Sequence, residues 1–253
     1  MGAQTETTEI RVGRQSIVGT MLAPQSKLPG VLFVHGWGGN RQRDMARAER
    51  IAGLGVICLT FDLRGHEKTE QQRHTVSREH NLEDVIAAYD HLLSHPGVDR
   101  SSIAVIGTSY GGYLAALLTA RRPINWLTLR APALYWDDAW QSPKISLDRG
   151  RLMRYRQARL GPADNHALRA CARFPGDVLI VESETDAFVP HATIMNHRTS
   201  FVSTHSLTHR RIMGADHTLS TERSQRAYSE ILHGWITEMI IGHRIDKAAV
   251  NMG

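Results

Sequence analysis

The sequence lacks the features that mark secreted and membrane-spanning proteins. It contains only two cysteines in 253 residues, which excludes a disulfide framework. Cys58 lies inside the apolar run 56–61, where we expect a buried thiol. Residues 1–14 are polar and contain no apolar signal segment, and no apolar stretch is long enough to span a bilayer. These absences predict a cytoplasmic protein with no membrane insertion.

Internal repeats, low-complexity tracts and linker-like segments are also absent. Hydrophobic residues make up 42% of the sequence and charged residues 22%, far from the composition of disordered chains. A chain of 253 residues is long enough to bury one large core. We therefore predict a single domain over residues 1–253.

The excess of positive charge is not gathered into the block or basic helix of a nucleic-acid-binding protein. The net charge is +5, but the 30 lysines and arginines are scattered along the chain, which predicts no nucleic-acid partner. The densest groups are Arg41/Arg43 and Arg151/Arg154/Arg156. We interpret both groups as solvated faces, with attraction of anionic substrates as an alternative for the second.

Short apolar runs recur along the chain and predict a sheet. Runs rich in valine, isoleucine and leucine are typical of strands that are buried on both faces. The predicted strands are Ser16–Leu22, Gly30–Val34, Val56–Phe61, Ile103–Ile106, Trp126–Leu129, Val178–Val181 and His209–Met213. A further strand near residues 10–12 joins the first of these through a glycine-containing turn, which predicts an antiparallel hairpin at the start of an otherwise mostly parallel sheet.

Helical segments separate these runs. Apolar residues stand three and four apart over 43–54, 82–93, 112–121 and 222–241, as helices that pack one face on a sheet require. Strands alternating with such helices predict an α/β fold with helices on both faces of the sheet.

One connection is longer than a single crossover helix needs. Residues 132–177 separate two predicted strands, and long insertions in compact domains are usually functional. The segment contains Tyr135, Trp136 and Trp140. We predict a small lid over the site, with extra surface helix as the alternative, and the two tryptophans either shape the pocket or serve as packing residues.

The segment Gly107-Thr108-Ser109-Tyr110-Gly111 predicts a nucleophile elbow. A G-x-S-x-G match alone is only suggestive, but this one follows a predicted strand and precedes a predicted helix. Glycine is required on both sides because a side chain there would collide with the neighbouring strand and helix. Ser109 is thus the candidate nucleophile, with a simple helix cap as the alternative.

A serine hydroxyl needs a base and a group that orients the base. Among fourteen histidines, His217 stands on a loop between the last predicted strand and the last helix. Asp186 follows the strand that ends at Val181, and the order Ser109, Asp186, His217 is that of α/β-hydrolases. Glu182, Glu184 and Asp216 are the competing acids, although Asp216 adjoins His217 and is poorly placed to bond its ring.

Two backbone donors are the candidates for an oxyanion hole. The N–H of Tyr110 directly follows the nucleophile in the elbow. The second candidate is the N–H of Trp37, because the glycines of His35-Gly36-Trp37-Gly38-Gly39 allow the backbone to turn N–H groups toward a substrate oxygen. The alternatives are a plain strand-to-helix turn or a phosphate cradle, but no complete phosphate-binding motif is present.

Together these motifs resemble the α/β-hydrolase superfamily. The resemblance is strongest to small-lid members such as feruloyl or cinnamoyl esterases, dienelactone-hydrolase-like proteins and serine aminopeptidase-like proteins. It covers most of the chain and rests on five segments: His35–Gly38, Asp62–His66, Gly107–Gly112, Asp186–Pro190 and Gly214–His217. The resemblance implies an eight-stranded sheet with the active site at the carboxyl ends of the strands and the lid above it.

Two positions depart from the superfamily pattern. Glu67 stands where relatives usually carry glycine after the D-x-R-G-H turn, which leaves open whether His66 or Glu67 touches the substrate. Arg130 stands where relatives often carry an apolar or small residue. We expect Arg130 to pair with a carboxylate, with binding of an acidic substrate group as the alternative.

These residues predict a serine hydrolase that cleaves carboxylic esters through an acyl-enzyme intermediate. The expected partner is a small-molecule acyl substrate, with neither a cofactor nor a metal required, and a homo-oligomer is left open. Acyl thioesterase and aminopeptidase-like amidase activities are alternatives on the same framework. A catalytically silent ligand-binding protein is the alternative from another class, and the intact set of Ser109, Asp186 and His217 argues against it.

Overall fold

The computed structural model describes residues 4–23 and 28–250, which form one continuous eight-stranded sheet. The strand order is β1-β2-β4-β3-β5-β6-β7-β8. The strands are β1 (Gln4–Val12), β2 (Gln15–Ala23), β3 (Leu28–Val34), β4 (Ile57–Phe61), β5 (Val98–Thr108), β6 (Trp126–Arg130), β7 (Asp177–Ser183) and β8 (Ser206–Ile212). Strand β2 pairs antiparallel with β1 and β4, and the remaining pairs are parallel. The predicted hairpin and mostly parallel sheet are confirmed.

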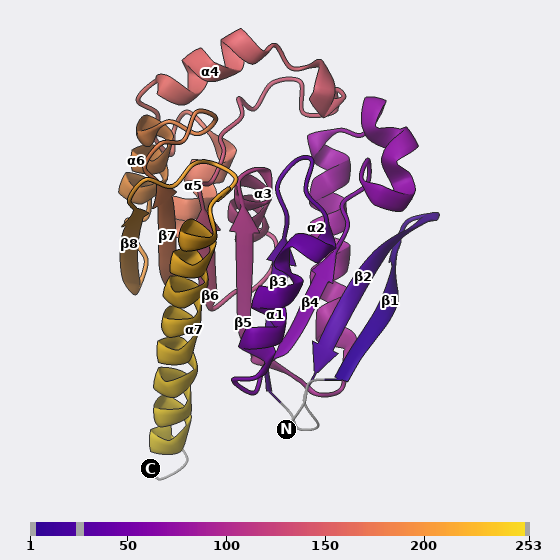
Figure 1. Ribbon diagram of the computed structural model, residues 1–253, viewed down its shortest axis with the longest axis vertical. Coiled ribbons are helices and arrows are strands. Elements are labelled where there is room, and N and C mark those ends of the chain that lie inside the picture. Colours follow the sequence, from indigo (N-terminus) through magenta and orange to yellow (C-terminus); the bar gives the residue numbers. More distant parts are fainter. Residues whose placement is uncertain (1–3, 24–27, 251–253) are drawn as a thin grey trace.

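Helices cover both faces of this sheet (Figure 1). The α-helices are α1 (Met45–Ala52), α2 (Arg78–Ser94), α3 (Tyr110–Leu118), α4 (Arg149–Gln157), α5 (His166–Arg173), α6 (His191–Ser200) and α7 (Glu222–Val250), and short 3-10 helices are η1 (Arg41–Asp44), η2 (Glu67–His74) and η3 (Lys144–Ser146). Helix α7 continues beyond the predicted end at 241, and α3 begins two residues before its predicted start. No helix of the described ranges is long and apolar enough to cross a membrane.

The core is split by the sheet into two apolar layers. Along β3, Leu32 and Val34 join the layer under α2, α3 and α5, whereas Val31 and Phe33 join the layer under α1 and α7. Neighbouring residues point to opposite faces of a strand, so a strand buried on both sides must be apolar throughout. This requirement produces the continuous apolar runs of the sequence.

The long connection between β6 and β7 contains η3, α4 and α5. Helix α5 packs with α3 against the sheet, whereas α4 lies above the carboxyl ends of the strands (Figure 1). Part of the segment is therefore ordinary crossover, and part is placed where a lid would be. Its function as a lid stays a prediction.

Candidate active site

Ser109 occupies a strained turn between β5 and α3. Its φ is +54° and its ψ is −112°, a conformation that L residues with a side chain rarely adopt. A hydrogen bond of 2.8 Å from the Ser109 N–H to the Arg130 carbonyl fixes the turn against β6. Gly111 and Gly107 make the turn sterically feasible, because a Cβ would lie 2.0 Å from the Val34 oxygen at Gly111 and 2.5 Å from the Gly111 oxygen at Gly107. The predicted steric reason for glycine is present on both sides of Ser109.

The structure brings Ser109, His217 and Asp186 together in one hydrogen-bonded series. His217 Nε2 lies 2.9 Å from Ser109 Oγ, and His217 Nδ1 lies 2.6 Å from Asp186 Oδ2. Because an ionised carboxylate only accepts hydrogen bonds, Nδ1 carries the proton, and Nε2 is free to accept the hydroxyl proton of Ser109. The other oxygen of Asp186 accepts from the N–H groups of Phe188 and Val189, both at 2.8 Å. These bonds hold the carboxylate behind the imidazole.

The competing acids are engaged elsewhere. Glu182 is buried and contacts His191 at 2.7 Å and His209 at 3.1 Å. Glu184 accepts from the N–H of Gly214, and Asp216 accepts from the N–H of Ser220. None of these three carboxylates contacts the His217 ring among the described residues.

Two backbone N–H groups beside Ser109 have no hydrogen-bond partner in residues 4–23 and 28–250. They belong to Trp37 and Tyr110, the two candidate oxyanion donors, whose role stays a prediction. The loop of Trp37 lies directly against the nucleophile, because a Cβ on Gly36 would stand 3.3 Å from Ser109 Cβ. Gly38 has a φ of +77°, and the N–H of Gly39 donates to the Gly36 carbonyl at 2.9 Å, so the loop folds into a tight turn.

A buried histidine pair supports this loop. His66 Nε2 accepts from the Gly38 N–H at 3.0 Å, and His35 Nε2 accepts from the Leu63 N–H at 3.1 Å. Burial lowers the pKa of each histidine to about 4, so both rings remain neutral acceptors at neutral pH. His66 therefore contacts the protein, whereas the exposed Glu67 accepts from Asn40 at 2.6 Å. The structure gives Glu67 a φ of +48°, which explains why glycine is usual there.

The expectation that Arg130 pairs with a carboxylate is wrong. Arg130 is buried at the end of β6, and among the described residues no carboxylate forms an ion pair with it. Its Nη2 instead donates to Ser183 Oγ at 3.1 Å and to the Asp216 carbonyl at 3.3 Å. Burial lowers the pKa of Arg130, and the nearby charge of Asp186 partly offsets this. Arg130 thus anchors the segment that carries His217, a role invisible in sequence because Ser183 and Asp216 are distant along the chain.

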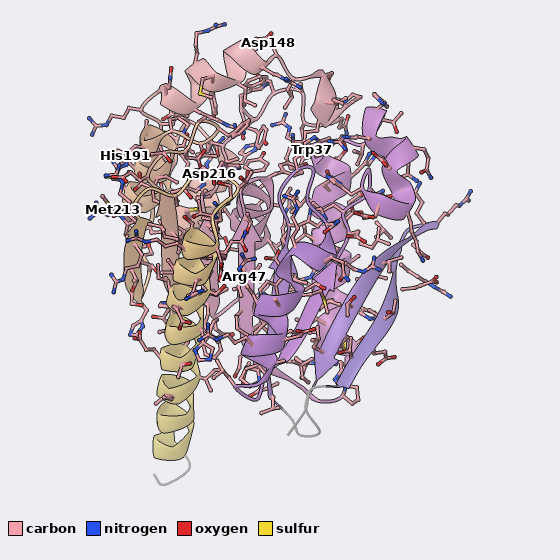
Figure 2. All side chains as sticks on the ribbon, in the orientation of Figure 1. Trp37, Arg47, Asp148, His191, Met213 and Asp216 are labelled. Atoms are coloured by element: carbon pink, nitrogen blue, oxygen red, sulfur yellow. The ribbon has the colours of Figure 1, made fainter. Side chains whose placement is uncertain are left out.

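The residues of the candidate site lie at the carboxyl edge of the sheet. At this edge, Trp37 and Asp216 lie below α4 and its capping residue Asp148 (Figure 2). The model of the prolyl oligopeptidase family matches residues 42–242. The chain belongs to this family. The resemblance to α/β-hydrolase serine hydrolases, and with it the hydrolase class, is confirmed by this match and by the folds of similar solved structures.

Solved structures of low sequence identity share the fold of this prolyl oligopeptidase family member. A structure of Est1E from Butyrivibrio proteoclasticus with ferulic acid bound has a TM-score of 0.73 at 19% identity, covering 92% of this chain and 99% of that one. Dienelactone hydrolase from Anabaena variabilis has a TM-score of 0.67 at 19% identity, covering 94% and 99%. At these identities the likeness shows the fold alone.

Curated relatives match a shorter part of the chain. The quorum-quenching protein AidA of Acinetobacter baumannii is 37% identical over 86 residues, which are 33% of this chain and 28% of AidA. The chain thus spans less than a third of the length of this relative.

In this family member, the side chain that the connection between β6 and β7 brings to the elbow is not one of the two tryptophans. Tyr135, not Trp136 or Trp140, faces the elbow, with its ring centroid 5.5 Å from that of Tyr110. Trp136 packs against Tyr155 and Arg151, and Trp140 lines a separate cavity near α2 and α5. These contacts fit the interpretation that the two tryptophans serve as packing residues, and not the interpretation that they shape the pocket at Ser109.

The solvated-face interpretation is wrong for Arg156 and for Arg41. Arg156 is buried and donates to the carbonyls of Leu134 (3.1 Å) and Phe188 (2.8 Å). Arg41 is half-buried and pairs with the buried Asp62. Sequence reasoning also missed Lys144, which lies over the Trp37 ring. In the polar stretch Gln141–Ser146 it has no pattern that distinguishes it from a surface lysine.

Proposed function

We propose that this chain is a serine hydrolase that cleaves carboxylic esters through an acyl-enzyme at Ser109. The observation that carries the proposal is the unbroken series from Asp186 through His217 to Ser109, with distances of 2.6 and 2.9 Å. The half-buried Ser109 is open to a substrate, and two unpaired N–H groups stand beside it. These are the groups that acyl transfer requires.

In the acylation step, Ser109 Oγ attacks the ester carbonyl carbon while His217 Nε2 takes the hydroxyl proton. Asp186 keeps the imidazole in the orientation and tautomer that can accept this proton and stabilises the imidazolium that forms. The carbonyl oxygen becomes an oxyanion, which accepts hydrogen bonds from the N–H groups of Trp37 and Tyr110. When the tetrahedral intermediate collapses, the C–O bond breaks and His217 returns the proton to the leaving alcohol.

Deacylation repeats the sequence with water. His217 removes a proton from a water molecule, whose oxygen attacks the acyl carbon, and the same two N–H groups stabilise the second oxyanion. The carboxylic acid leaves as the proton passes from His217 to Ser109 Oγ. The ester is thus split into an acid and an alcohol with one water consumed.

The direct test is Ser109→Ala, assayed with 4-nitrophenyl esters and with a fluorophosphonate probe. We expect kcat to fall by at least about a thousandfold, because the oxyanion donors alone retain only part of the rate enhancement. Labelling by the probe should reach one equivalent in the wild type and disappear in the variant. Ser94→Ala, at an exposed serine at the end of α2, is the matched control.

Near-normal turnover by Ser109→Ala would reject the assignment, and absence of labelling in the wild type would favour a catalytically silent binding protein.

Peptide amides are a second candidate substrate class, and the match to the prolyl oligopeptidase family favours them. Amide leaving groups need protonation more strongly than alcohols do, but the same His217 can supply the proton. Matched aryl esters, acyl thioesters and peptide 4-nitroanilides with one acyl group would rank the three activities by kcat/KM. The ester proposal fails if the anilide or the thioester is preferred.

A further inference from the structure

Lys144 packs on the side chains of the two residues that are the candidate oxyanion donors. Its Nζ lies 4.0 Å from the centroid of the Trp37 ring and 4.9 Å from that of the Tyr110 ring. These are the two residues whose N–H groups are unpaired beside Ser109. The position is fixed by the backbone, since the Lys144 N–H donates to the Val76 carbonyl at 2.9 Å and the preceding residue, Pro143, forms a bridge with Ser77. The backbone therefore holds Lys144 against the rings of the two residues that are the candidate oxyanion donors.

Other cations lie near Lys144, and no carboxylate in the described part of the chain forms an ion pair with it. Within the described ranges, neither Lys144 nor Arg156 forms an ion pair with a carboxylate. Arg156 lies 4.9 Å over the Tyr135 ring, and Arg73 lies 5.5 Å over the Trp37 ring with Glu70 at 3.8 Å as its ion-pair partner. Two partly desolvated cations without a counter-charge are energetically costly in an unliganded protein.

Tyr135 lies between these cations. Burial raises the pKa of its phenol, but the charges of Lys144 and Arg156 and hydrogen bonds from them outweigh burial, so the net pKa is lowered. Burial likewise lowers the pKa of Lys144, and Tyr135 opposes that effect. The environment of the phenol therefore favours negative charge at this position.

We propose that Lys144, which Tyr135 holds in place, binds a carboxylate on the acyl part of the substrate. The inference rests on the proposed esterase function. We assign the carboxylate to the acyl side because the leaving group must lie near His217, which protonates it, whereas Lys144 packs on the rings of Trp37 and Tyr110. A lysine ammonium forms a charge-assisted hydrogen bond with a carboxylate, and none of residues 4–23 and 28–250 supplies a carboxylate to Lys144.

The test compares two esters with similar acyl length, mono-4-nitrophenyl glutarate, which ends in a carboxylate, and 4-nitrophenyl hexanoate, which ends in a methyl group. We expect the ratio of their kcat/KM values, carboxylate over methyl, to fall roughly tenfold or more in Lys144→Met, as the loss of one charged hydrogen bond predicts. In Lys144→Arg, the ratio of the two kcat/KM values should stay close to that of the wild type. Lys68→Met, at an exposed lysine of η2, is the matched control and should leave the ratio at the wild-type value.

A structural role for Lys144 gives a different result. If the lysine only fastens the segment to Trp37 by a cation–π contact, both esters lose rate equally in Lys144→Met and the ratio stays constant, which overturns the inference. A preference for 4-acetoxybenzoate over phenyl acetate without a preference for the glutarate ester would also overturn it, since the carboxylate would then belong to the leaving group.

Stoichiometric fluorophosphonate labelling of each variant establishes that the site is folded. Loss of labelling in the wild type rejects the esterase function itself, whereas a constant ratio with intact labelling rejects only the carboxylate site.

Discussion

At the level of single residues, the backbone around Ser109 depends on the absence of neighbouring side chains. Ser109 itself has a positive φ, and Gly111 passes so close to β3 that even a methyl group would overlap the Val34 and His35 oxygens. The strained turn is tolerated because both flanking glycines leave space for the adjoining strand. The exposure of the Ser109 hydroxyl is therefore determined by residues that take no part in the proposed chemistry.

Substitution of Gly111 tests this dependence. We expect Gly111→Ala to lower the free energy of unfolding by roughly 3 kcal/mol or more, because the overlapping atoms belong to backbone that cannot move aside. Gly234→Ala is the control: this exposed glycine of α7 has open space around it, and alanine should stabilise the helix by about 0.5–1 kcal/mol. Urea unfolding measures both. Equal effects at the two sites would contradict the steric argument.

At the level of elements, the connection between β6 and β7 is fixed by one buried asparagine. Asn165 caps α5 by accepting from the N–H groups of Ala167 and Leu168, and its amide donates to the Tyr135 carbonyl at 2.7 Å and to the Tyr155 hydroxyl at 3.0 Å. One side chain thereby joins the crossover helix to the strand-end segment that carries Tyr135. Asp148 caps α4 in a simpler way, accepting from the Arg151 N–H at the surface.

We expect the loss of these two caps to lower the free energy of unfolding by different amounts. We expect Asn165→Ala to lower the free energy of unfolding by about 3 kcal/mol, since the substitution leaves buried donors and acceptors unpaired. Asp148→Ala should cost about 1 kcal/mol or less, because water replaces the lost acceptor. Chemical denaturation of both variants is the measurement, and a cost for Asp148→Ala as large as that for Asn165→Ala would refute the distinction.

At the level of the whole molecule, buried neutral histidines connect stability to pH. Burial lowers the pKa of His35, His66 and His197 from 6.5 to about 4. The unfolded chain binds protons at these positions below about pH 6.5, while the folded chain does not until about pH 4. Their contribution to stability is therefore fully present above pH 6.5 and is lost as the pH falls from 6.5 to 4.

His197 allows this contribution to be isolated, because it is buried in α6, where its Nδ1 lies 3.0 Å from the Thr193 carbonyl of the same helix. In His197→Leu, the loss of stability between pH 6.5 and 4 should be smaller than in the wild type by up to about 3 kcal/mol. Urea unfolding at several pH values gives the difference between the two proteins, so the contributions of other groups cancel. The exposed His74→Leu serves as the control for removal of a histidine. Parallel curves for His197→Leu and the wild type would disprove the linkage.

Much of the fold could be predicted because it depends on local patterns. The apolar runs are the strands, since residues buried on both faces of a sheet must be apolar, and the G-x-S-x-G segment lies between a strand and a helix. The meeting of Ser109, Asp186 and His217 could also be predicted. Each residue follows a parallel strand, and the loops after parallel strands lie at the same edge of the sheet. These features need no knowledge of distant contacts.

Tertiary structure alone decided how the charges are used. Arg130 and Arg156 carry the same guanidinium as any surface arginine, yet both are buried against backbone carbonyls that lie far away in sequence. Lys144 likewise acquires its place over Trp37 only through packing of the β6–β7 connection. The sequence by itself determined the fold and the candidate nucleophile, base and acid. The environment of each cation depends on the desolvation and partners that other segments bring, and such long-range contacts leave no periodic trace in the chain.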